Sequence, residues 1–145
     1  MTNGIEKDFI VVYADDDPDD IELVTEAFDK YASNVKLKTF SDGLTVLSYL
    51  RNLPGMDDMP CLIILDINMP GMNGKDCLKQ IRHLEFFKDV PIVLFTASVS
   101  DKDKEFAKLY NAGFITKPLS TVQMEKIAEH FIDHCTEDIQ KLIIK

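Results

Sequence analysis

What the sequence lacks argues first against a membrane protein. No apolar run approaches the about 20 residues that a membrane-spanning helix needs. The first residues, Met-Thr-Asn-Gly-Ile-Glu-Lys-Asp, contain no apolar signal segment. No internal repeat, low-complexity tract or linker interrupts the chain. We therefore expect a cytoplasmic protein without a membrane partner.

Cysteine and positive charge are scarce as well. The three cysteines, Cys61, Cys77 and Cys135, are an odd number without paired spacing, which favours buried free thiols over disulfides or zinc. Sixteen basic against 25 acidic residues give a net charge of -9, which argues against nucleic acid as a partner. A protein partner, together with a metal ion, suits this charge better.

The composition that remains is that of one soluble globular domain. The 145 residues are 46% hydrophobic and 28% charged. This length buries a sizeable core but leaves no room for a second catalytic or DNA-binding module.

The most informative stretch is Leu62 to Pro70, which reads Leu-Ile-Ile-Leu-Asp-Ile-Asn-Met-Pro. Four apolar residues without alternation predict a strand buried on both faces of a parallel sheet. Asp66 follows directly, so we expect it at the carboxyl end of this strand, where ligands bind in open α/β sheets. A carboxylate among core residues needs cations or hydrogen-bond donors around it.

Four further segments have the pattern of strands. Phe9–Ala14 and Pro91–Phe95 are unbroken apolar runs, whereas Val35–Phe40 alternates as a half-exposed strand does. Phe114–Thr116 is a short fifth strand. Each is followed by a segment with helical spacing.

The expected helices begin at capping residues. Asp17 precedes Pro18 at the first helix, Ser41-Asp42 starts the second, Asn73-Gly74 opens the third, and Ser120 caps the fifth. The side chains that we expect to face the core from the second, fourth and fifth helices are Leu44, Leu47, Leu50, Leu53, Phe106, Leu109, Tyr110, Met124, Ile127, Phe131 and Ile132.

Strand and helix therefore alternate five times with short connections. This order predicts right-handed crossovers and a three-layer α/β domain, (βα)5, around a doubly wound parallel five-stranded sheet.

Few polar residues lie just past the strand ends: Asp15, Asp16, Asp66, Thr96 and Lys117. All ends of a parallel sheet point to the same side, so these residues become neighbours. Three carboxylates repel one another unless a cation such as Mg²⁺ lies between them. With a lysine and a threonine hydroxyl, such a site can receive phosphoryl oxygens, and Asp66 is the best-placed nucleophile, giving an acyl phosphate.

Each of these residues also has a simpler interpretation. Asp15 and Asp16 could belong to an acidic first helical turn, and Thr96 and Lys117, each taken alone, could be ordinary strand-end and surface residues. Their coincidence beside Asp66 favours the site. Capping and solvation suffice to explain the other acidic residues of that turn, which are Asp17, Asp19 and Asp20.

The ordered motifs resemble the receiver domains of two-component response regulators, of the stand-alone, CheY-like kind. They are Asp-Asp after the first strand, Asp-Ile-Asn-Met-Pro-Gly-Met-Asn-Gly after the third, Thr-Ala after the fourth and Lys-Pro after the fifth. The resemblance covers about Asp8 to Phe131. It implies a flavodoxin-like fold and phosphorylation by a histidine kinase or a phosphotransfer protein.

The resemblance also implies a metal site and a phosphoacceptor. Asp66 would accept the phosphoryl group. Asp16 and Asp66 would bind Mg²⁺ (or Mn²⁺) with the backbone carbonyl of Asn68, and Asp15 would help through water. Lys117 would pair with the phosphoryl group.

Further roles follow from the same resemblance. Thr96 would hydrogen-bond the phosphoryl group in the activated state, and Phe114 would be the aromatic switch residue, although such a residue taken alone is more often plain core. Asn68 and Ser98 would modulate the rate of dephosphorylation. The Lys117-Pro118 bond would be a cis peptide.

The last residues depart from the family pattern. We expect residues 1–135 to form the receiver and 136–145 a helical extension, with no separate output domain. Ile139, Leu142 and Ile143 recur at helical spacing. Two interpretations stay open: the extension packs back onto the domain, or it forms a surface for a homodimer or another partner.

The leading functional hypothesis is a stand-alone receiver that is not an enzyme beyond its own phosphorylation and dephosphorylation. It would signal in trans, to an unknown protein target, through the surface formed by residues 100–134. An alternative is a Mg²⁺-dependent phosphohydrolase of the haloacid dehalogenase type, but that class needs a second Asp where this chain has Asn68. A third possibility is a receiver fold that serves only as a scaffold.

Overall fold

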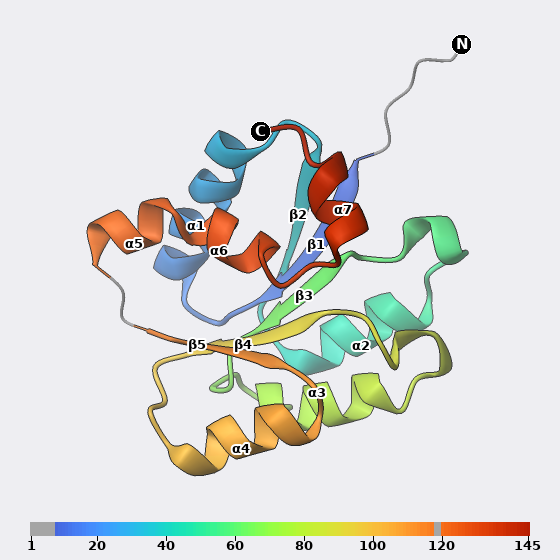
Figure 1. Ribbon diagram of the computed structural model, residues 1–145. Coiled ribbons are helices and arrows are strands. Elements are labelled where there is room, and N and C mark those ends of the chain that lie inside the picture. The colour runs from blue at the N-terminus through green and yellow to red at the C-terminus, as the bar shows by residue number, and fades with distance from the viewer. Residues whose placement is uncertain (1–7, 118–119) are drawn as a thin grey trace.

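Five parallel strands form one sheet in the order β2-β1-β3-β4-β5 in the computed structural model, which describes residues 8–117 and 120–145 (Figure 1). The strands are β1 (Phe9–Ala14), β2 (Val35–Phe40), β3 (Leu62–Leu65), β4 (Ile92–Thr96) and β5 (Gly113–Thr116). The expected α/β class and parallel five-stranded sheet are confirmed.

Helices cover both faces of the sheet. Figure 1 shows α1, α5 and α6 on one side and α2, α3 and α4 on the other. The helices are α1 (Pro18–Tyr31), α2 (Gly43–Arg51), α3 (Gly74–Arg82), α4 (Asp101–Leu109), α5 (Thr121–Glu125), α6 (Ile127–Ile132) and α7 (Glu137–Leu142), with short 3-10 helices η1 (Met56–Asp58) and η2 (Glu85–Phe87). Within the described residues, no helix is both long enough and apolar enough to cross a membrane.

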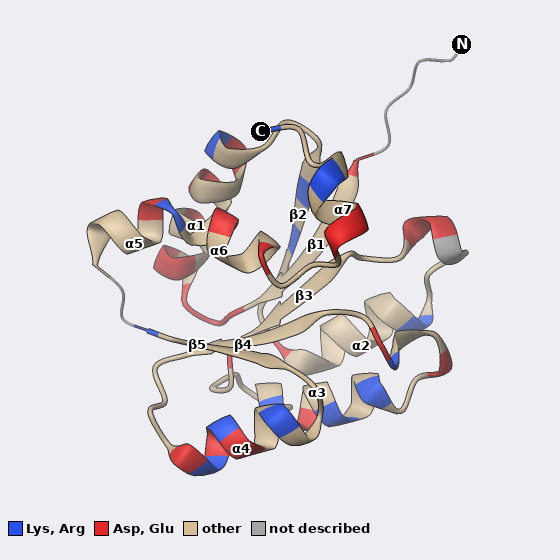
Figure 2. Cartoon of the chain, viewed as in Figure 1, with Lys and Arg blue, Asp and Glu red and all other residues tan. Residues whose placement is uncertain are grey.

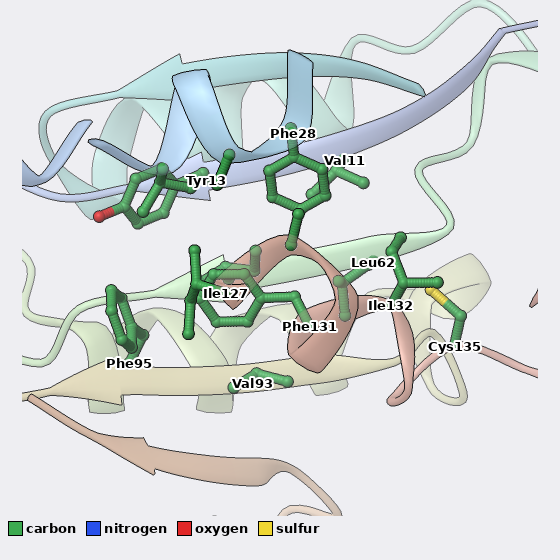
Figure 3. Close-up of a cluster of buried hydrophobic side chains, with 14 of the residues drawn as sticks. Val11, Tyr13, Phe28, Leu62, Val93, Phe95, Ile127, Phe131, Ile132 and Cys135 are labelled. Atoms are coloured by element: carbon green, nitrogen blue, oxygen red, sulfur yellow. The ribbon is translucent and has the colours of Figure 1, made fainter. Parts of the chain in front are cut away.

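Alternation along the strands divides the interior into two cores. In β1, Val11 and Tyr13 face α1 and α6, whereas Val12 and Ala14 face α2 and α3. Aromatic rings pack against one another in the first core (Figure 3): Phe131 stacks on Phe28 with centroids 6.1 Å apart and meets Phe95 edge-on at 5.0 Å. These contacts hold α1 and α6 against this face of the sheet.

The expected core faces need two corrections. Leu44 is 59% exposed and Leu109 is 76% exposed. Leu44 lies about 100° around α2 from the buried Gly43, and Leu109 lies about 200° around α4 from the buried Ala107. The helical spacing of apolar residues correctly predicted that Leu47 and Leu50 are buried, but it wrongly assigned Leu44 and Leu109 to the core.

The fifth expected helix is divided. Ser120 caps α5 in a capping box with Gln123, as expected for the cap, but α5 ends at Glu125 and α6 begins at Ile127. The predicted core residues Ile127, Phe131 and Ile132 all lie on α6 and are buried. The predicted cis peptide before Pro118 lies outside the described residues.

The last residues lie against the α1–β2 connection. The Asn34 side chain, 6% exposed, donates to the carbonyl of Leu142 (2.9 Å) and accepts from the N–H of Ile144 (2.8 Å). The Ser33 N–H donates to the carbonyl of Ile144 at 2.9 Å. Ile143 is buried in the first core, whereas Leu142 and Ile144 are exposed. The three cysteines are buried and free, as the sequence predicted.

Candidate functional site

The sheet topology brings the predicted strand-end residues to one edge. The ladders continue just past the strands, since the Asp66 N–H donates to the carbonyl of Ala14 (2.9 Å) and the Lys117 N–H donates to that of Thr96 (2.6 Å). The central strands carry almost no charge along their length, whereas the connection from β1 to α1 is acidic (Figure 2). A charged site therefore stands on an apolar sheet.

Lys117 joins the carboxylates of this edge. Its ammonium nitrogen lies 2.7 Å from Asp15 Oδ2, 2.8 Å from Asp20 Oδ2 and 3.2 Å from Asp66 Oδ2. It also lies 4.9 Å from the ring centre of Phe95. Burial opposes the charged form, but the hydrogen bonds to Asp15 and Asp20 outweigh it, so the pKa of Lys117 is raised and the ammonium stays charged.

Asp15 is the buried anchor of the site. It is fully buried and accepts hydrogen bonds from the Tyr13 hydroxyl (2.6 Å to Oδ2) and the Asp17 N–H (3.0 Å to Oδ1). Burial works against the charged form, yet the bonds from Lys117 and Tyr13 prevail and hold the pKa of Asp15 below its usual value. Asp15 is therefore an anion at neutral pH.

Asp66 accepts fewer hydrogen bonds than Asp15. It is 6% exposed, and its Oδ1 accepts from the Asn68 N–H at 3.2 Å. Burial is the largest influence and raises the pKa of Asp66 to about 6, with Lys117 acting against the rise and Asp15 adding to it. Asp66 therefore accepts few hydrogen bonds from the protein, so its oxygens can also bind another ligand.

The carboxylates can hold a divalent cation. One oxygen each of Asp15, Asp16 and Asp66 lies within 4.8 Å of the others, and Asp16 is exposed. An all-oxygen donor set suits a hard cation such as Mg²⁺ or Mn²⁺. The site opens into a hollow of about 420 Å³ lined by Asp16, Asp17, Asp20, Leu23, Asp66, Asn68, Ala97, Lys117 and Met124.

Thr96 and Ser98 lead from the site to α4. Thr96 is fully buried at the end of β4, and its hydroxyl oxygen lies 3.4 Å from the Ser98 N–H. The Ser98 hydroxyl donates to Asp103 of α4 (2.6 Å), and Lys75 of α3 donates to the other oxygen of Asp103 (2.8 Å). Ser98 is thus directed at α4. Phe114 is half-buried against the second core, on the side of α4.

Gly74 at the start of α3 lets the chain pass close to Asp66. A Cβ atom at this position would lie 2.0 Å from the carbonyl oxygen and 2.7 Å from the carbonyl carbon of Asp66. The Gly74 N–H donates to the carbonyl of Ile67 at 2.9 Å. Only glycine fits this approach, which fixes the backbone after the acidic residue.

Sequence reasoning missed two contacts of the candidate site. Asp20 was interpreted as a solvated first-turn residue, but it binds Lys117. Its position four residues before the buried Val24 places both on one face of α1, and this spacing was the available signal. Tyr13 stands two residues before Asp15 and therefore shares its side of β1, which also predicts their contact.

Comparisons with known proteins identify the family to which the chain belongs. The sequence model of the response regulator receiver domain matches residues 11–129. The probable methanogenesis regulatory protein FilR2 of Methanothrix harundinacea is 27% identical over 132 residues, covering 89% of this chain and 84% of that protein. The chain spans less of other relatives, for example 28% of a probable cyclic di-GMP phosphodiesterase of Vibrio cholerae.

Two solved structures share the fold. The phosphorylated cyanobacterial phytochrome response regulator RcpA has a TM-score of 0.79 at 24% identity, covering 90% of this chain and 96% of that one. The Mn²⁺-bound response regulator Rcp1 has a TM-score of 0.76 at 23% identity, covering 86% and 92%. Because the family's sequence model spans most of the chain, the protein belongs to the response regulator receiver domain family and is CheY-like in fold.

Proposed function

We propose that this chain is a stand-alone receiver that accepts a phosphoryl group on Asp66 from a histidine kinase or a phosphotransfer protein. The observation that carries the proposal is the position of the Lys117 ammonium, which touches both Asp66 and the buried Asp15 at the floor of an open hollow. A nucleophilic carboxylate, a fixed cation and room for a donor are together in one place.

The chain's own residues account for the transfer step. An Asp66 oxygen attacks the phosphorus atom of a phosphohistidine, an O–P bond forms, and the N–P bond breaks. The imidazole nitrogen leaves with the bonding electron pair and takes up a proton. Lys117 lies within 3.2 Å of Asp66 and neutralises charge on the phosphoryl oxygens as they arrive.

A divalent cation is part of the proposal. Asp15, Asp16 and Asp66, with the backbone carbonyl of Asn68, would hold Mg²⁺ or Mn²⁺, and the clustered oxygens fit such an ion. The bound ion would supply further neutralisation of phosphoryl charge. The Mn²⁺-bound structure of Rcp1, which shares this fold, supports the assignment.

The proposed output is a change in the surface made by α4, β5 and α5. A phosphoryl group adds roughly 1.5 to 2 negative charges. In the proposed switch, the Thr96 hydroxyl and Lys117 move toward this charge, and Phe114 turns into the space that Thr96 leaves. The Thr96–Ser98–Asp103–Lys75 chain of contacts connects this movement to α4.

The proposed receiver signals in trans to another protein. Asn68 lines the hollow beside Asp66, and Ser98 stands two residues after Thr96, so both are proposed to modulate dephosphorylation. The excess of acidic residues does not favour nucleic acid or an anionic membrane.

Labelling with radioactive acetyl phosphate and Mg²⁺ tests the assignment. The wild type should give an alkali-labile phosphoprotein, whereas Asp66→Asn should give at least about tenfold less label, because the amide is a far poorer nucleophile. Asp76→Asn removes an exposed carboxylate of α3 and should label normally. Equal labelling of Asp66→Asn would refute the proposal, and steady turnover of p-nitrophenyl phosphate would favour a phosphohydrolase.

A further inference from the structure

We propose that Asp20 is a positioning residue that restrains Lys117 and so limits how readily Asp66 is phosphorylated. The inference rests on the proposed function of Asp66 and adds a residue that regulates the same site. Asp20 belongs to the first turn of α1, so the restraint comes from a helix and not from a strand end.

The Lys117 ammonium group has a hydrogen-bond acceptor for each of its donors. An ammonium group has three hydrogens, and three carboxylate oxygens lie within hydrogen-bond distance, one each from Asp15, Asp20 and Asp66. The contact with Asp66 is the longest, at 3.2 Å, against 2.7 Å for Asp15 and 2.8 Å for Asp20. Asp20 therefore competes with Asp66 for the ammonium and draws it toward α1.

Of the three partners, Asp20 is the one that Lys117 can leave at least cost. The Asp15 side chain is fully buried, so losing Lys117 would leave an anion without compensation for its burial. The Asp20 side chain is 23% exposed and regains water when released. A phosphoryl group on Asp66 offers new anionic oxygens, so we expect the Asp20 contact to open when phosphorylation occurs.

Removing the charge of Asp20 should therefore favour the phosphorylated form. A neutral amide accepts a weaker hydrogen bond than a carboxylate, so Lys117 would turn toward Asp66. Asp20→Asn should bind beryllofluoride with Mg²⁺ roughly threefold to tenfold more tightly than the wild type, as expected for loss of one partly exposed competing ion pair. Acetyl phosphate should label it faster by a similar factor.

The neighbouring Asp19 provides the matched control. Asp19→Asn removes the same charge from the same helical turn, and Asp19 is exposed with its N–H bonded to Asp17. Beryllofluoride affinity, measured from backbone amide signals by NMR, should change less than about twofold in Asp19→Asn. Asp20→Glu, which restores the charge, should return the affinity toward the wild-type value. Equal affinities of Asp20→Asn and Asp19→Asn would overturn the inference.

The ammonium itself gives a second readout. Hydrogens held in three hydrogen bonds exchange slowly with water, so the Lys117 side-chain nitrogen should be visible by ¹⁵N NMR and should shift or broaden in Asp20→Asn but not in Asp19→Asn. An unchanged signal in Asp20→Asn would contradict the restraint. If the wild type accepts no label and binds no beryllofluoride while this signal depends on Asp20, the proposed function fails and the contact stands.

Discussion

At the scale of single residues, two adjacent carboxylates differ in how the fold treats their charge. Asp15 receives bonds from Tyr13, Asp17 and Lys117, and its pKa is lowered in spite of burial. Asp66 has fewer donors, and burial raises its pKa to about 6. The fold therefore stabilises the charged form of Asp15 and disfavours the charged form of Asp66. A disfavoured anion of this kind is expected where a cation or a phosphoryl group binds.

The raised pKa of Asp66 predicts a pH-dependent cost in stability. Between the unfolded value near 3.8 and the folded value of about 6, the folded protein binds more protons, so this group's contribution to stability falls as pH rises. Without divalent cations, Asp66→Asn should be more stable than the wild type by about 1 to 3 kcal/mol at pH 8. This difference in the free energy of unfolding should vanish near pH 4, because below this pH Asp66 is protonated and neutral in both the folded and the unfolded wild type.

Urea denaturation in EDTA from pH 4 to pH 8 measures this difference. Added Mg²⁺ should stabilise the wild type, because a ligand that binds only the folded protein raises its stability. The stability of Asp66→Asn should stay nearly unchanged, because this variant lacks one of the proposed metal ligands. A stability difference that stays constant over this pH range would show that Asp66 carries no raised pKa.

At the scale of elements, the start of α3 depends on its close approach to the end of β3. Alanine at position 74 would place Cβ 2.0 Å from the Asp66 carbonyl oxygen, so one of the two segments must move. Gly74→Ala should lower the free energy of unfolding by about 1 to 3 kcal/mol or more, as overpacking against backbone does. Displacement of Asp66 should also slow phosphorylation by acetyl phosphate.

Gly55→Ala is the control for that change. No atom lies within 4 Å of a Cβ at position 55, and the glycine does not have positive φ. We expect this variant to be neutral or more stable by up to about 1 kcal/mol, through a less flexible unfolded chain. Chemical denaturation of both variants decides the matter, and similar stabilities would argue against a tight contact at Gly74.

The sequence predicted where the strands and helices lie better than it predicted which of their side chains are buried. Apolar runs between turn residues, and for β2 the alternation of apolar and polar residues, located the five strands. Asp17, Asn73 and Ser120 marked helix starts, because capping is a local interaction. Leu44 and Leu109 were assigned to the core wrongly, since the buried arc of a helix depends on what packs against it. The contact of Asp20 with Lys117 likewise joins residues 97 positions apart.

At the scale of the whole molecule, two cores meet at one sheet and the site stands on their shared edge. Tyr13 and Phe95 belong to the first core, and each also touches the site, through Asp15 and Lys117 respectively. Phe114 belongs to the second core, beside α4. The geometry of the acidic edge is thus tied directly to the packing of the first core, and the proposed switch would connect it to the second core through Phe114.

The end of the chain provides a test of how far the first core extends. Ile143 is 8% exposed and packs in that core, while its neighbour Ile144 is 40% exposed. Ile143→Ala should destabilise the protein by about 2 to 4 kcal/mol, in line with loss of a buried aliphatic side chain. Ile144→Ala should cost no more than about 0.5 kcal/mol, as surface substitutions do.

Denaturation of both variants, combined with light scattering, separates packing from dimer formation. If the exposed Leu142 and Ile144 formed a homodimer interface, the mass would be that of two chains, and Ile144→Ala would lower both mass and stability at low protein concentration. If the segment only completes the core, the mass remains that of one chain with and without beryllofluoride. Equal stability of Ile143→Ala and the wild type would exclude the packing role, because a buried side chain cannot be truncated without loss.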